Sequence, residues 1–310
     1  MAGMTEDEVR NYEVLKAKAD KGDRGSQYKL GLCFANGSGV TQDFSEAVFW
    51  WRKAAEQGEL SAQSNLANCY LQGIGVKKNE AQAISWYKKA AEQGSRIAQY
   101  NLSNRYDRGE GVPRDVAQSV YWCRKAAEQG LANAQYSLAL CYRNGEGVEK
   151  DLTQAAMWYR KAAEQGLAEA QCSLGVRYEN GEGVTRDLEQ AVMWYNKAAE
   201  QGLANAQYSL GVCYSFGKGV AKDLTKAARL YRKAAEQGLP QAQTNLGVCY
   251  AFGDGVPKDE IEAYAYWSLA SASDNLAKEK VAVMEKRMTP NEMVAGKKRS
   301  LELLREFSLR

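Results

Sequence analysis

Three serines in the chain are each followed three positions later by a lysine, a spacing that suits attack by a serine hydroxyl on an acyl group. The pairs are Ser26 with Lys29, Ser85 with Lys88, and Ser215 with Lys218. Ser273-Asp274-Asn275 also matches the second motif of enzymes that recognise β-lactams. The Lys-Thr-Gly motif that completes such sites does not occur. β-Lactam hydrolysis is therefore kept as an alternative that the missing motif argues against.

Other catalytic arrangements lack a residue type that they need. The chain contains no histidine, which is the most common general base and the partner of serine or cysteine in catalytic triads. It also contains no Cys-x-x-Cys pair, which argues against a zinc site. Glu56 recurs with five equivalents along the chain, as expected of a structural residue rather than of a single catalytic acid. We therefore predict a protein that is not an enzyme and has no catalytic residue, cofactor or metal.

The elements that carry these residues repeat with a strict period. The pentapeptide Ala-Ala-Glu-Gln-Gly recurs every 36 residues, and a Gly-x-Gly-Val tetrapeptide recurs in the same register. The pentapeptides end at Gly58, Gly94, Gly130, Gly166, Gly202 and Gly238. A fixed period of this length is typical of a solenoid, in which neighbouring repeats stack to bury one continuous core.

Each repeat predicts two helices joined by short turns. In the first helix Ala134, Leu138 and Tyr142 lie four residues apart, which places them on one face, and Gly145 ends the helix. The second helix carries apolar residues such as Trp158 and ends at the pentapeptide glycine. We expect the tryptophans at this position to be core residues, since they keep phase with the small alanines.

The second helix of each repeat begins at an acidic or amide residue that is suited to capping. These residues are Asp43, Asn79, Asp115, Asp151, Asp187, Asp223 and Asp259. A glutamate or glutamine follows three positions later in every repeat except at Lys226. This spacing predicts a capping box, in which the two side chains cap each other's backbone N–H groups.

One repeat read in full resembles a known family. Its pattern is Ala134-x-Tyr136-x-Leu138-Ala139-x-x-Tyr142-x-x-Gly145-x-Gly147-Val148-x-x-Asp151, continued by Ala155-x-x-Trp158-Tyr159-x-Lys161-Ala162-Ala163-x-x-Gly166. This pattern resembles the Sel-one-like repeat, a relative of the tetratricopeptide repeat, and it recurs seven times. The resemblance implies a right-handed α/α superhelix that acts as an adaptor for protein complexes, and many members are bacterial.

We therefore predict an all-α solenoid of seven 36-residue helix-turn-helix repeats with helical caps. Residues 1–22 are expected to form an N-terminal capping helix, a degenerate repeat, and residues 23–274 the seven repeats. Residues 275–310 are expected to form C-terminal capping helices separated near Thr289-Pro290. In that segment Met293, Leu301, Leu304 and Phe307 are predicted to cover the last open face of the stack.

Charge and cysteine usage narrow the classes of partner. The net charge of +3 comes from interleaved acidic and basic residues, which argues against general binding of nucleic acid. No apolar run approaches the roughly 20 residues of a membrane span, and the acidic N-terminus does not resemble a signal peptide. We expect a cytoplasmic monomer, with specialised secretion left open. Five of the seven cysteines share one phase, so stacked repeats would place them about 10 Å apart, too far for disulfides.

Partner binding is assigned to one side of the first helices, opposite the buried alanines and leucines. We call this side the first-helix face, and the family resemblance implies that it lines a concave groove. The residues predicted to form it are Tyr100, Asn101, Asn104, Arg105, Arg108, Tyr136, Leu140, Asn144, Val176, Arg177, Asn180, Tyr208, Val212, Phe216, Val248 and Phe252.

On this face the asparagines are expected to hydrogen-bond a peptide backbone, and the arginines to select acidic groups by bidentate contacts. Phe216 and Phe252 are expected to seat apolar side chains. The sequence thus predicts a non-enzymatic scaffold that binds a protein or peptide. The alternative is a secreted effector or signalling regulator that uses the same face on host proteins.

Overall fold

The computed structural model describes residues 5–308, which form seventeen α-helices and no β-strand. The predicted all-α class is confirmed. The chain divides into two compact units, of which unit 1 ends at Asp151 and unit 2 begins at Leu152.

The helices follow the predicted alternation. The first helices of the repeats are α2 (Arg24–Asn36), α4 (Leu60–Gln72), α6 (Arg96–Arg108), α8 (Ala132–Asn144), α10 (Ala168–Asn180), α12 (Ala204–Phe216) and α14 (Pro240–Phe252). The second helices are α3 (Phe44–Glu56), α5 (Glu80–Glu92), α7 (Val116–Glu128), α9 (Leu152–Glu164), α11 (Leu188–Glu200), α13 (Leu224–Glu236) and α15 (Glu260–Ala270). Three helices flank them: α1 (Glu6–Asp20), α16 (Asn275–Glu285) and α17 (Pro290–Ser308).

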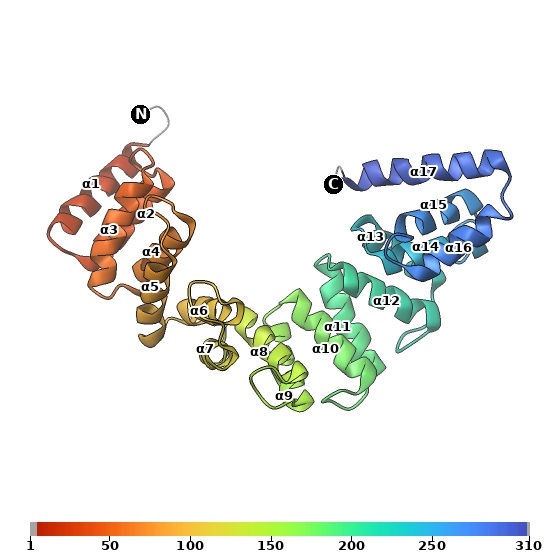
Figure 1. The fold of residues 1–310 in the computed structure, drawn as a ribbon, viewed down its shortest axis with the longest axis horizontal. Helices are drawn as coiled ribbons and strands as arrows, with labels where there is room; N and C mark the ends of the chain where they lie inside the picture. Colours follow the sequence, from red (N-terminus) through yellow and green to blue (C-terminus); the bar gives the residue numbers. More distant parts are fainter. Residues whose placement is uncertain (1–4, 309–310) are drawn as a thin grey trace. The chain divides into compact units, whose positions relative to one another are not determined.

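Consecutive helices pack against each other within each unit (Figure 1). In unit 1 this holds from α1 to α8, and in unit 2 from α9 to α16, while α17 packs against α15. The cores consist of small and aromatic side chains, as the repeat pattern predicts. In unit 1, for example, Ala62 and Leu66 of α4 and Tyr87 of α5 are buried in one cluster. Alanine on one helix therefore leaves room for an aromatic ring on the next.

The first helices end at the first glycine of each Gly-x-Gly-Val turn. Gly37, for instance, has a φ of 72° and donates its backbone N–H to the carbonyl of Cys33, and the other first helices end in the same left-handed conformation. Glycine populates this region at no steric cost, so the chain can leave the helix within one residue.

The second helices are capped as predicted, but by only one arm of the capping box. The Asp187 carboxylate accepts a hydrogen bond of 3.0 Å from the backbone N–H of Gln190. The Asp187 N–H donates instead to the carbonyl of Tyr178 in α10, at 3.0 Å. The same bond to the preceding first helix recurs at the caps of α3, α5, α7, α13 and α15. The cap thus ties the two helices of a repeat together, and the reciprocal arm is complete at Thr5 and Glu8 of α1.

Helices α16 and α17 lie on either side of Thr289, and the leucine that faces inward in α17 is not one of those expected. Leu303 is buried in unit 2, and Met293 and Phe307 pack against its cores. Leu301 and Leu304, which we expected to cover the open face, are exposed. In α17 the packed side is therefore set by Leu303 together with Gly296, which lies directly against the Tyr264 ring.

All seven cysteines are free thiols in the described part of the chain, including the five of the ladder. Burial raises the pKa of the thiols to about 11 at Cys69 and to about 12 at Cys123. Among residues 5–308 there is no helix long and apolar enough to cross a membrane.

Candidate functional site

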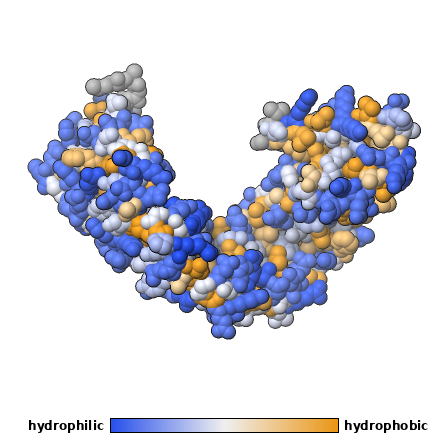
Figure 2. Space-filling model, viewed as in Figure 1, coloured by the Kyte–Doolittle hydropathy of each residue, from blue (hydrophilic) through white to orange (hydrophobic). Residues whose placement is uncertain are grey.

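The first-helix face lies on α6 and α8 in unit 1 and on α10, α12 and α14 in unit 2. Its predicted residues are half-buried or exposed, except for Arg177. In unit 1 the Tyr100 hydroxyl of α6 lies 3.4 Å from the Ser137 hydroxyl of α8, so neighbouring first helices contribute to one surface. On the view in Figure 2, apolar patches lie between stretches of hydrophilic surface.

In unit 1 the two predicted arginines of α6 differ in how accessible they are to a partner. Arg105 is half-buried and forms an ion pair with Glu110, which lies in the turn that follows α6. Arg108 is exposed, and its Nη1 lies 3.8 Å from Glu110 Oε1. Exposed pairs of this kind contribute little to stability. Arg108 therefore remains able to exchange its partner, whereas Arg105 is half-buried and paired with the turn.

In unit 2 Arg177 has a role different from the predicted one. It is only 8 % exposed and forms an ion pair with Glu182 in the turn after α10. The Asn180 Nδ2 also donates to Glu182 Oε1, at 3.2 Å. An arginine that is buried and already paired does not offer a bidentate site to a partner. The arginine that replaces a ladder cysteine here is paired with the turn that follows its own helix.

Two of the four predicted asparagines are engaged within their own turns, whereas Asn101 and Asn104 are half-buried in α6. In unit 1 Asn144 Nδ2 donates to Glu146 Oε1 at 3.0 Å, which parallels Asn180 in unit 2. Both bonds are exposed and local, so water or a peptide carbonyl can replace the glutamate.

A polar cluster on this face of unit 2 is absent from the predicted set. Glu179 of α10 accepts a hydrogen bond of 2.8 Å from the Tyr195 hydroxyl. It also forms an ion pair with Lys218, with 3.2 Å between Nζ and Oε1. Burial and the hydrogen bond to this carboxylate both raise the pKa of Tyr195. The cluster joins two consecutive repeats beside Asn180 and Phe216. The sequence hint for this cluster is that the residue equivalent to Glu179 varies between repeats. Other repeats carry Ala35, Asp107 and Ser215 at this position.

Two phenylalanines of the face are strongly exposed. Phe216 and Phe252 are the last residues of α12 and α14, and each is 70 % exposed. Val212 and Val248, one turn earlier, are half-buried against the cores of unit 2. Burial of Tyr208, also on α12, raises its pKa. Unit 2 thus presents an apolar strip that runs from packed valines to solvent-exposed rings.

The residues that suggested acyl transfer lie in helices, turns and helix caps of the two units. Ser26 is buried in α2, and Ser85 lies on α5, both in unit 1. Ser273-Asp274-Asn275 lies in unit 2, where Asp274 caps α16 and accepts a 2.6 Å hydrogen bond from Thr244. Lys218 is paired with Glu179. Among residues 5–308 there is no group of three or more acidic, cysteine or histidine side chains that could hold a metal ion.

Paired helices that repeat every 36 residues, with variable residues gathered on the first helices, define a helical-repeat protein of the scaffold type. The Sel1 repeat model matches seven consecutive segments, 25–59, 60–95, 96–131, 132–167, 168–203, 204–239 and 240–275. The chain therefore belongs to the Sel1 repeat family. Sel1 repeats form scaffolds that are compatible with protein–protein interaction.

Solved structures from two bacteria are similar to this chain. One is c5321, a protective antigen of uropathogenic Escherichia coli, with 33% identity over 97% of this chain and 72% of that chain and a TM-score of 0.66. The other is a Sel1 repeat protein from Oxalobacter formigenes, with 37% identity over 89% of this chain and 80% of that chain and a TM-score of 0.69. A search of curated proteins finds no match.

Proposed function

We propose that this chain is a non-enzymatic scaffold that binds a segment of a partner protein on its first-helix face. The observation that carries the proposal is the pair of exposed phenylalanines, Phe216 and Phe252. They occupy equivalent positions of consecutive repeats in unit 2, where the preceding repeats carry Asn36, Gln72, Arg108, Asn144 and Asn180. The apolar contact is thus confined to the last two repeats.

The energetics favour an apolar anchor at this place. Each phenylalanine leaves most of its ring in water, and burying such a side chain contributes about 1.5–3 kcal/mol. A segment with two apolar side chains spaced to reach both rings would gain this contribution twice. The Glu179–Lys218 pair beside Phe216 offers both signs of charge to the same segment. Exposed aromatic residues beside polar groups are typical anchors of protein interfaces.

Selection of displayed peptides tests this proposal. Random peptides are selected on the full chain, and the binding of one selected peptide is then measured for three proteins: wild type, Phe216→Ala/Phe252→Ala and Phe49→Ala. Phe49 is an exposed phenylalanine of α3, a second helix, and serves as the matched control.

We expect the double variant to bind the peptide at least about tenfold more weakly, since each lost anchor is a large part of a small interface. The control is expected to bind as wild type does. Selection of no peptide, or equal binding by all three proteins, would overturn the proposal.

A further inference from the structure

A ladder of glutamine side chains runs between the repeats. One glutamine near the start of each first helix is almost fully buried, and its Nε2 donates to an alanine carbonyl eight residues earlier, as Gln207 does to Ala199 at 3.4 Å. In five of the repeats its Oε1 accepts a hydrogen bond from the pentapeptide glutamine thirty residues later. These rungs are Gln57 to Gln27 (2.7 Å), Gln93 to Gln63 (3.2 Å), Gln129 to Gln99 (2.8 Å), Gln201 to Gln171 (2.8 Å) and Gln237 to Gln207 (2.9 Å).

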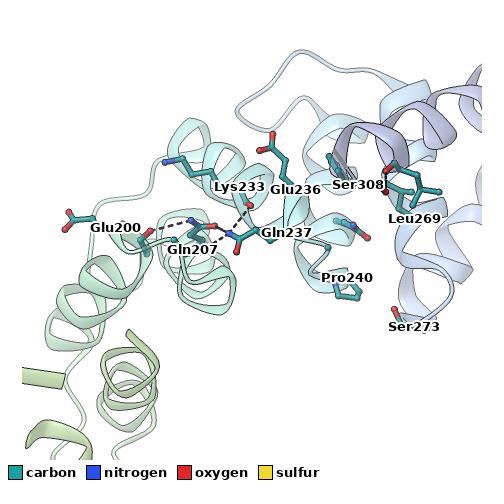
Figure 3. A pocket seen from close by; sticks show the side chains of 15 residues that line it. Glu200, Gln207, Lys233, Glu236, Gln237, Pro240, Leu269, Ser273 and Ser308 are labelled. Atoms are coloured by element: carbon teal, nitrogen blue, oxygen red, sulfur yellow. Dashed lines mark hydrogen bonds between the residues drawn. The ribbon is translucent and has the colours of Figure 1, made fainter. Parts of the chain in front are cut away.

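The ladder breaks at its last position. Gln243 is the next buried glutamine, 6 % exposed, and its Nε2 donates to the Ala235 carbonyl at 3.2 Å. The residue thirty positions later is Ser273, where the other repeats carry glutamine. Gln243 Oε1 therefore has no hydrogen-bond partner among residues 5–308. In Figure 3 hydrogen bonds join Gln237 to Gln207, whereas Ser273 lies apart and none reaches it. Gln243 Oε1 is open to solvent rather than fully buried, so a donor that enters from outside can reach it.

A cavity of about 840 Å³ lies at this break, and both Gln243 and Ser273 line it. Leu269 of α15 and Leu304 and Phe307 of α17 form its apolar part. The shorter serine side chain and the end of α17 thus create a recess at the point where the repeat pattern ends.

The electrostatic potential in the cavity favours binding of a cation. Helices α11 and α13 both end at its lining, at Glu200 and Glu236. The C-terminus of a helix carries a partial negative charge from its free carbonyls. The carboxylates of Glu200 and Glu236 add to this charge, while Lys233 opposes it from an exposed position.

We propose that this cavity binds an arginine side chain of a partner peptide. The guanidinium group donates to Gln243 Oε1, in the place of the missing glutamine amide, and lies near the helix C-termini. Its planar face and methylene stem pack on Phe307 and Leu304, an arrangement that suits arginine better than lysine. This site is separate from the first-helix face and does not depend on it.

Calorimetric titration of the full chain with blocked pentapeptides tests the proposal. The probes are Ala-Leu-Arg-Leu-Ala and the same peptide with citrulline, lysine or glutamate in place of arginine. Citrulline keeps the shape of arginine and removes its charge. We expect the arginine peptide to bind on the order of tenfold more tightly than the citrulline peptide, because charge-assisted hydrogen bonds are the stronger ones. The glutamate peptide is expected not to bind.

Variants locate the site. Ser273→Gln supplies the missing rung and should weaken binding of the arginine peptide on the order of tenfold, while thermal unfolding stays at or above the wild-type temperature. Ala272→Gln introduces the same residue one position away, outside the lining, and should bind as wild type does. Leu304→Ala, which removes an exposed side chain, should weaken binding several-fold without affecting the fold.

The arginine peptide should still bind Phe216→Ala/Phe252→Ala, which separates this site from the first-helix face. The proposal is overturned if wild type does not bind the arginine peptide, if citrulline binds equally well, or if neither Ser273→Gln nor Leu304→Ala weakens binding.

Discussion

Gly31 and Trp51 show how a single pair of residues sets the packing within a repeat. A Cβ atom on Gly31 would lie 2.4 Å from Trp51 Cδ1, and Trp51 is buried. In the next repeat the same two positions hold Ala67 and Tyr87, which are buried in one cluster. Both tryptophans at this position, Trp51 and Trp267, face a glycine, whereas tyrosine faces either alanine or glycine, so the largest ring has the smallest partner.

This match predicts the effect of adding one methyl group. Gly31→Ala should lower the free energy of unfolding by about 1–3 kcal/mol, because a rigid indole cannot move aside. Gly25→Ala, in the same helix α2, meets nothing closer than 3.8 Å and serves as the control. It should be neutral or stabilising by up to about 1 kcal/mol, as helix propensity dictates. Urea unfolding compares the two, and equal effects would show that the contact does not control stability.

The buried thiols predict a loss of stability in alkali. Burial raises the pKa of Cys172, Cys213 and Cys249 to about 11 each, above the ordinary value of 9.0. Between these values the unfolded chain releases protons that the folded chain keeps. The contribution of the thiols to the free energy of unfolding should therefore be fully present below about pH 8 and be lost as the pH rises through 9 towards 11. Urea unfolding under reducing conditions measures it, and Cys123→Ala should fall less steeply. A free energy that rises over this range would refute the explanation.

At the scale of the element, the Gly-x-Gly turn has two glycines with different tasks. The first ends the first helix, whereas the second brings the turn against the preceding repeat. A Cβ on Gly219 would lie 2.3 Å from the Leu188 carbonyl oxygen at the start of α11. Gly238 also has a positive φ, of 82°, but a Cβ there would meet nothing within 4 Å.

These two glycines form a matched pair for mutation. Both alanine variants share the backbone strain of a positive φ, so their difference isolates the contact between repeats. Gly219→Ala should be about 1–3 kcal/mol less stable than Gly238→Ala, because backbone cannot yield as a flexible side chain does. Thermal and urea unfolding of both variants check this difference. Equal destabilisation would mean that the repeats separate slightly at no measurable cost.

The sequence predicts the positions of the helices better than their caps and their packed sides. The period and the apolar stripe define both helices of every repeat, and Asp187 and its equivalents mark where the second helices begin. The capping box was only half right, because the cap N–H donates to Tyr178 of the first helix, a contact that spacing within one helix does not reveal. We predicted the wrong buried leucines in α17. Leu301 and Leu303 fit the helical pattern equally well until the partner helix is known.

At the scale of the whole molecule, the candidate site was less predictable than the fold. The exposed pair Phe216 and Phe252 stands out because both depart from the polar residues at their phase. The burial and pairing of Arg177 could not be predicted from the equivalent positions of the other repeats, since its partner Glu182 lies in a different part of the repeat. The sequence alone shows that Ser273 stands where the other repeats carry glutamine. This difference gains meaning only when the structure shows that the preceding glutamines accept hydrogen bonds from the residues at this phase.

The central claim is that the first-helix face of unit 2 holds a protein partner. Affinity capture from a lysate of the source cells, quantified by mass spectrometry, tests it most directly. Wild type, Phe216→Ala/Phe252→Ala and the Phe49→Ala control are compared side by side. We predict at least one protein that is retained by wild type and the control and is reduced about tenfold or more by the double variant, as expected for the loss of central anchors. Equal retention by all three proteins, or no protein above background, would contradict the claim.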